Sequence, residues 1–178
     1  MPWRSESRKS DEVLAGLSVS DWRKDPGPIT NGQLHFDEGG VAFDYPASWH
    51  LYYPHTNSMM DGSLVLVASN PVAPCRGSSC QSYTLTDGSV AVEFRVGGMP
   101  GGPDGTTATE RIGGQPAFRQ DWTTGAVHTA NEGHEWSVRF GASNRILGIT
   151  VSVRGPGLSD LRRAADELVQ SITISPPQ

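Results

Sequence analysis

The feature that most constrains the fold is a series of short segments in which apolar and polar residues alternate. Residues 34–36 and 41–45 show this alternation on either side of a glycine pair, and it returns at 136–140 and 147–153. Alternation with a period of two is typical of strands that bury one face. Turn-length links join the segments, and the chain has 21 glycines and 13 prolines, so the sequence predicts an antiparallel β-sheet.

Two further segments indicate where the centre of this sheet lies. Residues 64–68 are apolar at every position, which is typical of a strand covered on both faces. Residues 89–96 carry valine or phenylalanine at every second position, with small or charged residues between them, including Glu93 and Arg95. We expect this second segment to be half-buried, with Glu93 and Arg95 on the face turned away from the core.

The C-terminal segment has the pattern of an amphipathic helix. After the break at residues 155–157, Ser159 stands where an N-cap is expected. The apolar residues of this segment fall on one stripe of a helix: Leu158, Leu161, Ala164, Ala165, Leu168, Val169 and Ile172. We expect the stripe to cover one face of the sheet.

The predicted fold class is therefore α+β, an antiparallel β-sheet covered by the C-terminal amphipathic helix and a smaller N-terminal helical layer. The second layer is expected because residues 64–68 need cover on both faces. Its expected source is a short helix at residues 10–17 or a helical turn at residues 46–49. We expect residues 1–32 to form a polar N-terminal segment with that short helix and an entry loop, and residues 33–175 to form a single α+β domain.

Charge and hydropathy exclude several classes of partner. The net charge of −5 disfavours a general nucleic-acid binder, which needs a basic face to neutralise phosphates, and also an anionic membrane surface. No apolar run approaches the roughly 18 residues of a membrane span, so no transmembrane segment is expected. Residues 1–10 lack the apolar core of a secretory signal. We expect no nucleic-acid partner, and a protein or small ligand of unknown identity.

Cys75 and Cys80 are the two cysteines of the chain and enclose a loop of arginine, glycine and serine. A small local disulfide is one interpretation. Two reduced thiols, or a metal or redox site, are the alternatives, although two cysteines alone complete no zinc sphere. A disulfide in a processed or truncated chain would indicate an extracytoplasmic protein, whereas reduced thiols would fit the cytoplasm.

A second candidate set combines imidazole and carboxylate groups in one loop and the strand after it: His128, Glu132, His134 and Glu135. Such groups bind zinc or supply a base for hydrolysis. The spacing is not that of a zinc-protease helix, and adjacent strand residues point to opposite faces. Ordinary solvated loop residues are the alternative interpretation, and neither a metal nor a cofactor is expected.

The segment 49–55 is the candidate interaction surface. It contains Trp49, His50, Tyr52, Tyr53 and His55. Exposed aromatic residues mark recognition sites, so the hypothesis requires these rings to be accessible. The alternative is that Trp49 and one tyrosine belong to the core, with the rest at the surface.

Two short motifs are similar to those of a known group. They are Tyr45-Pro46-x-x-Trp49 after the first hairpin, and Ile112-Gly113-Gly114-x-Pro116-Ala117 before the final hairpin and helix. On these motifs, residues 33–175 resemble the PsbP-like (Mog-like) α/β/α sandwich superfamily, in its uncharacterised bacterial branch. That group includes photosystem extrinsic subunits, Ran-binding Mog proteins and bacterial extracytoplasmic lipoproteins. The cysteine-bearing loop and the missing lipobox depart from it.

The resemblance implies a non-enzymatic binding or assembly role, because its motif residues shape strand ends and bends and include no catalytic group. The sequence also contains no Gly-x-Ser-x-Gly elbow and no phosphate-binding loop. A binding module is therefore the expected function. A hydrolase or metal-dependent enzyme that uses the His128/Glu132/His134 loop is the alternative.

Overall fold

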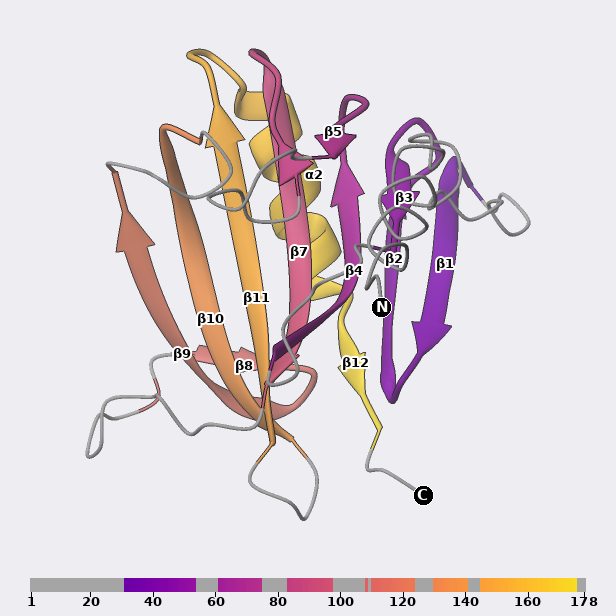
Figure 1. Ribbon diagram of the computed structural model, residues 1–178. Helices are drawn as coiled ribbons and strands as arrows, with labels where there is room; N and C mark the ends of the chain where they lie inside the picture. Colours follow the sequence, from indigo (N-terminus) through magenta and orange to yellow (C-terminus); the bar gives the residue numbers. More distant parts are fainter. Residues whose placement is uncertain are drawn as a thin grey trace, which may run out of the picture.

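The computed structural model describes residues 31–53, 61–74, 83–97, 108, 110–123, 130–140 and 145–175. These residues form mostly antiparallel strands and one helix, α2 (Ser159–Gln170) (Figure 1). The largest sheet has the strand order β3 (His50–Tyr52), β4 (Asp61–Ala68), β7 (Ser89–Gly97), β11 (Arg145–Arg154), β10 (Glu132–Phe140), β9 (Gln115–Trp122) and β8 (Glu110–Ile112). A smaller sheet has the order β1 (Gln33–Glu38), β2 (Val41–Pro46) and β12 (Thr173–Ile174), and β5 (Ala73–Pro74) pairs with β6 (Tyr83–Thr84).

One face of the seven-stranded sheet, which we call the helix-side face, carries the main core. Val65, Phe94 and Ile149 lie in one row across β4, β7 and β11, and all three are buried. Phe43 of β2 stacks on Phe94, with ring centroids 4.4 Å apart and ring planes 2° apart. The helix α2 packs against both β2 and β7 and buries Leu168 there. The small sheet and the helix therefore share this face.

This arrangement corrects the predicted fold class. The described chain is mostly β, and the partner of α2 in covering the large sheet is a second antiparallel sheet. Val41, Phe43 and Tyr45 alternate on β2 and are buried in the main core, while β2 is paired on both sides, by β1 and β12. A hairpin that buries one face can stack on a sheet as well as extend it, and the alternation is the same in both cases. The helix predicted at residues 10–17 lies outside the described residues.

The opposite face has a smaller core. Tyr52, Leu66 and Ala91 of the sheet are buried there with Val72 and Tyr83, which belong to the region of the β5–β6 ladder. The predicted turn at residues 46–49 does not cover this face, because Trp49 is buried in the main core on the helix side. The cover on this face within the described chain is therefore extended rather than helical.

The central strand β7 is consequently buried on both faces over most of its length, and the expectation of half-burial is wrong. Glu93 is 1% exposed. Its carboxylate lies 3.0 Å from Nε of Arg95 and accepts a hydrogen bond of 3.4 Å from the Tyr83 hydroxyl. The charged residue can be buried because it gains these partners.

The helix follows the predicted stripe and differs at its start. Ala165, Leu168 and Val169 are its buried residues. Ser159 is the first helical residue and not the cap, since Leu158 occupies the N-cap position without a side-chain cap hydrogen bond. The described residues contain no helix that is long and apolar enough to cross a membrane.

The chain after α2 anchors the β8–β9 turn. A backbone bridge joins Thr173 to Gly113, whose φ is +56°. A Cβ at Gly113 would lie 2.8 Å from Cγ1 of Ile174, so glycine permits this close approach. The contact holds the outer edge of the large sheet near the C-terminal end of α2.

Candidate functional site

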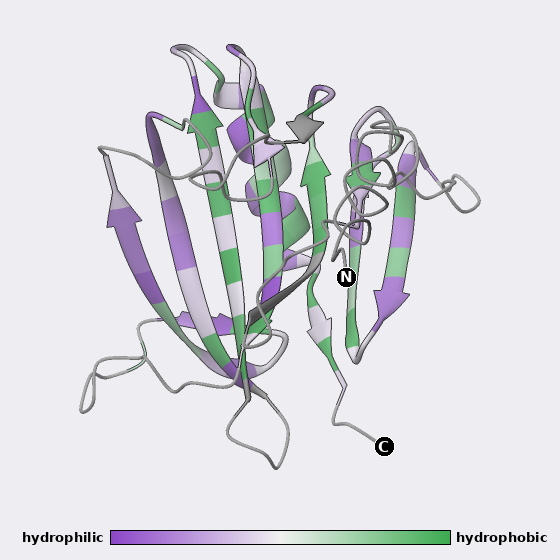
Figure 2. Ribbon diagram, viewed as in Figure 1, coloured by the Kyte–Doolittle hydropathy of each residue, from purple (hydrophilic) through white to green (hydrophobic). Residues whose placement is uncertain are grey.

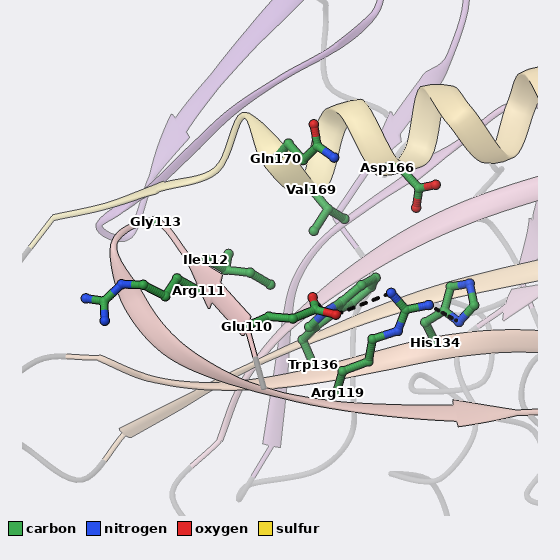
Figure 3. A pocket seen from close by; sticks show the side chains of 10 residues that line it. All are labelled: Glu110, Arg111, Ile112, Gly113, Arg119, His134, Trp136, Asp166, Val169 and Gln170. Carbon is green, nitrogen blue, oxygen red and sulfur yellow. Dashed lines mark hydrogen bonds and ion pairs between the residues drawn. The ribbon is translucent and has the colours of Figure 1, made fainter. Parts of the chain in front are cut away.

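A cleft of about 330 Å³ lies between α2 and the strands β8, β9 and β10 (Figure 3). Asp166 and Val169 project from the helix toward side chains of β9 and β10 on the other wall. Arg119 lies between Trp136 and His134 on that wall. This volume falls at the small end of the range for small-molecule sites.

The register of β9 and β10 brings the polar residues of the cleft together. Arg119 pairs with Trp136, and Asp121 pairs with His134. Residues that face each other across antiparallel strands project from the same face, which here is the helix-side face. Figure 2 shows hydrophobic residues along β4, β7 and β11 and hydrophilic residues along β9. The cleft therefore forms on the helix-side face where the cross-strand residues change from apolar, on the central strands, to polar, on β9.

Glu110 is held by two donors. Trp136 Nε1 donates to Oε2 of Glu110 over 2.8 Å, and Nη1 of Arg119 lies 3.4 Å from Oε1. Trp136 is 3% exposed, and a buried indole N–H requires an acceptor. The guanidinium carbon of Arg119 lies 5.2 Å from the Trp136 ring centroid, within reach of a cation–π interaction. The carboxylate, the guanidinium and the indole therefore fix one another.

Asp121 and His134 complete the network. Nε of Arg119 donates to Oδ1 of Asp121 over 2.8 Å, and this bond holds the pKa of the Asp121 carboxyl below its usual value. The same bond raises the pKa of the Arg119 guanidinium. Nδ1 of His134 lies 2.9 Å from Asp121 Oδ1 and 3.1 Å from Arg119 Nη2. A protonated Nδ1 donates to Asp121, whereas a bare Nδ1 accepts from Arg119, so the tautomer selects one bond.

The described members of the predicted imidazole and carboxylate set do not all lie together. Glu132 forms an ion pair with Arg162 of α2, and His134 lies in the cleft. Glu135 is exposed on the opposite face, as its adjacent position on β10 requires. His128 lies outside the described residues. Among the residues that the structure describes, no group of three or more histidine, cysteine and carboxylate side chains is arranged to hold a metal ion.

The aromatic segment is divided between the two cores. Trp49 is buried in the main core, and Tyr52 is buried in the smaller core on the other face. Tyr53 is partly buried and donates to Oε1 of Glu38 over 3.0 Å, and His50 is partly buried. His55 lies outside the described residues, as do Cys75 and Cys80. The condition that the rings be accessible is thus not met by Trp49 and Tyr52.

Three residues of the cleft and of its hydrogen-bond network were not candidates in the sequence. Arg119 and Asp121 have the pattern of the polar face of an ordinary strand, and Glu110 stands beside a turn. The signal in the sequence is the spacing of two: Arg119 and Asp121 are opposite charges two residues apart, and His134 and Trp136 have the same spacing in a later segment. The pairing of β9 with β10 is what turns this signal into a site.

Comparisons with known proteins return no match: no family model, no curated protein and no solved structure corresponds to this chain.

Proposed function

We propose that the chain is a non-enzymatic binding or assembly module whose ligand site is the cleft between α2 and strands β8–β10. The observation that carries the proposal is the Arg119 guanidinium, which two carboxylates hold over the Trp136 ring at the wall of an open cleft. Polar groups fixed in advance lose little freedom when a ligand binds, which favours recognition. The PsbP-like kinship suggested by the sequence motifs is compatible with such a role and stays a prediction.

The chemistry of the cleft favours a ligand that both donates and accepts hydrogen bonds. A guanidinium has five N–H groups; the contacts of Arg119 with Asp121 and Glu110 use two of them, and His134 accepts from a third when its Nδ1 is unprotonated. The remaining N–H groups donate to an acceptor on the ligand. The carboxylates of Glu110 and Asp166 accept from a donor on the ligand. A carboxamide group satisfies both sides, on a small molecule or on a side chain of a partner protein.

An NMR titration tests this proposal. Asparagine and glutamine, each acetylated and amidated at its ends, serve as probes, and the indole N–H of Trp136 serves as the reporter. We expect a saturable shift of that signal and of backbone signals in β8–β10. Arg119→Lys, which keeps the charge but removes the planar fork, and Glu110→Gln are expected to weaken the shift.

Glu135→Gln is the matched control, because it makes the same chemical change as Glu110→Gln on the opposite face of the sheet. It is expected to leave the titration unchanged. A wild-type protein whose cleft signals do not move with either probe would contradict the proposal. Equal reductions of the chemical-shift change in the Glu110→Gln and Glu135→Gln variants would contradict it as well.

One observation favours a second candidate, a hydrolase. Asp121 lies within hydrogen-bond distance of His134 Nδ1, the arrangement in which a carboxylate orients an imidazole base. The described lining of the cleft includes no serine, threonine or cysteine, so the base would have to act on water. Turnover of ester or amide substrates that disappears in His134→Gln would establish this candidate, and its absence across a substrate panel would remove it.

A further inference from the structure

Among the residues that the structure describes, no strand covers the outer edge of β9 over more than half of its length. β8 pairs with Gln115, Pro116 and Ala117 of β9, and the inner edge of β9 pairs with β10. Over residues 118–122, no strand of the described chain lies against the outer edge, and Figure 1 shows β9 continuing past β8 at the margin of the sheet. An open edge presents backbone groups that can pair with another strand.

The turn between β8 and β9 determines which backbone groups point outward. Gly113 and Gly114 both have positive φ, +56° and +77°, as a two-residue type I′ hairpin requires. Its closing pair, Ile112 and Gln115, exchanges backbone hydrogen bonds. Every second residue of β9 from Gln115 then directs its N–H and C=O away from β10. Within residues 118–122, which we call the open window, these residues are Arg119 and Asp121.

The side chains of the open window are complementary to those of a second, antiparallel copy of the same segment. Its midpoint is Gln120. With a two-fold axis at Gln120, Arg119 of one copy lies opposite Asp121 of the other, and Phe118 lies opposite Trp122. Opposite charges and aromatic pairs facing each other across antiparallel strands both stabilise pairing. On β1, an edge strand of the smaller sheet, a register that places His35 opposite Asp37 also places Leu34 opposite Glu38, so β1 lacks this double match.

We infer that β9 pairs with β9 of a second copy of this chain, in the antiparallel register centred on Gln120, and that the protein forms a homodimer with one continuous sheet. Arg119 and Asp121 of each copy then exchange backbone hydrogen bonds with Asp121 and Arg119 of the other. This interface goes beyond the proposed ligand site and does not depend on it, although Asp121 of each copy comes next to Arg119 of the other.

The length of the open window fits this register. In the register centred on Gln120, Ala117 of one copy lies opposite residue 123 of the other. The outer side of Ala117 is already paired with Glu110 of β8 in its own copy. A longer β9 would therefore meet β8 of the other copy, but β9 ends at Trp122. The paired segment has five residues on each side, so we expect weak, reversible association that depends on concentration.

Two opposite substitutions at Gln120 test the two-fold axis directly. Gln120 is exposed and on the face away from the cleft, so the fold tolerates a charge there. In the proposed dimer the two side chains at this position face each other. Gln120→Glu alone or Gln120→Lys alone brings like charges together and is expected to weaken self-association by about fivefold. An equimolar mixture of the two variants is expected to form heterodimers more tightly than either variant forms homodimers.

The measurement is sedimentation equilibrium from ~10 μM to ~1 mM protein, with native mass spectrometry to identify the heterodimer. Gln115→Glu and Gln115→Lys are the matched controls, because Gln115 is exposed on the same strand but faces β8. They are expected to associate like the wild type. A wild-type protein that stays monomeric throughout the range overturns the inference. Dimers that the single Gln120 variants leave unchanged, or a mixture without preferred heterodimers, overturn it as well.

Discussion

Two clusters of charged side chains lie on opposite faces of the seven-stranded sheet and differ in burial. The core cluster consists of Glu93, Arg95 and Tyr83, and its carboxylate is 1% exposed. The cleft cluster consists of Glu110, Arg119, Asp121 and His134, and the exposed fractions of its two carboxylates are 40% and 61%. In both clusters an arginine pairs with a carboxylate two residues away on the same strand, Arg95 with Glu93 and Arg119 with Asp121.

The difference follows from the place of each strand in the sheet. β7 is a central strand with cover on both faces, so water is excluded from Glu93. Burial and the nearby Glu93 raise the pKa of Tyr83 well above its usual value, so its hydroxyl stays protonated and can donate to the carboxylate. β9 lies near the margin, where solvent screens the charges. The core cluster is therefore important for stability, whereas the cleft cluster is available for recognition.

The largest effect is expected at Glu93. Glu93→Ala removes the partner of Arg95 and Tyr83 inside the sheet and should lower the free energy of unfolding by about 3 kcal/mol. Glu135 is its matched control, because Glu93 and Glu135 both pair with Thr150 in one row on the same face, and Glu135 is exposed. Glu135→Ala should change stability by less than about 0.5 kcal/mol. Urea denaturation measures both, and equal losses would abolish the contrast between the clusters.

The next effect concerns the turn that anchors the cleft. Gly113→Ala forces positive φ on alanine and drives its Cβ toward Ile174, at a cost of about 2 kcal/mol. Gly114 also has positive φ, but no atom lies within 4 Å of the place that a Cβ would take there, so Gly114→Ala should cost only about 1 kcal/mol. Thermal unfolding of the two variants isolates the contact with β12. If Gly114→Ala were the more damaging, the close approach at Gly113 would be wrong.

A smaller loss is expected from Tyr83→Phe, which removes a hydroxyl and leaves the buried ring. The Glu93 carboxylate loses one donor but keeps Arg95, so the free energy of unfolding should fall by about 1 kcal/mol. In a double-mutant cycle, Tyr83→Phe combined with Glu93→Ala should lower the free energy of unfolding by less than the sum of the two single losses, because each substitution removes the same hydrogen bond. Additive losses would show that the hydroxyl and the carboxylate do not interact.

The smallest effect is expected in the cleft cluster, in the pH dependence of stability. The pKa of Asp121 is lowered in the folded protein, chiefly by the hydrogen bond from Arg119. A lowered carboxyl pKa stabilises the fold above the ordinary pKa of the group, and this contribution disappears as the pH falls through the lowered value. Asp121→Asn should therefore be slightly less stable than the wild type at neutral pH, by less than about 1 kcal/mol, and equal to it in acid. A difference that grew on acidification would contradict this sign.

The sequence was sufficient to predict several strands, but it did not show which elements they pack against. The alternation at residues 41–45 predicted a strand correctly, because period two depends only on which side chains are apolar. It could not show that β2 stacks on the large sheet through Phe43, since the pattern is the same when a hairpin extends a sheet. The cleft was hidden for a similar reason, because Glu110 and Arg119 become neighbours only through the β8–β9 and β9–β10 registers.

The sequence by itself determined the antiparallel strands and the C-terminal helix, and it indicated their buried faces where apolar residues recur with a clear period. Only the tertiary structure decided that a second sheet joins the helix as cover, that Glu93 is buried, and that Arg119 meets Trp136. The physical reason is that periodicity is a local property of one element. Burial of an alternating charged residue depends on what is packed over it, and charge networks depend on the register between strands that are distant in sequence.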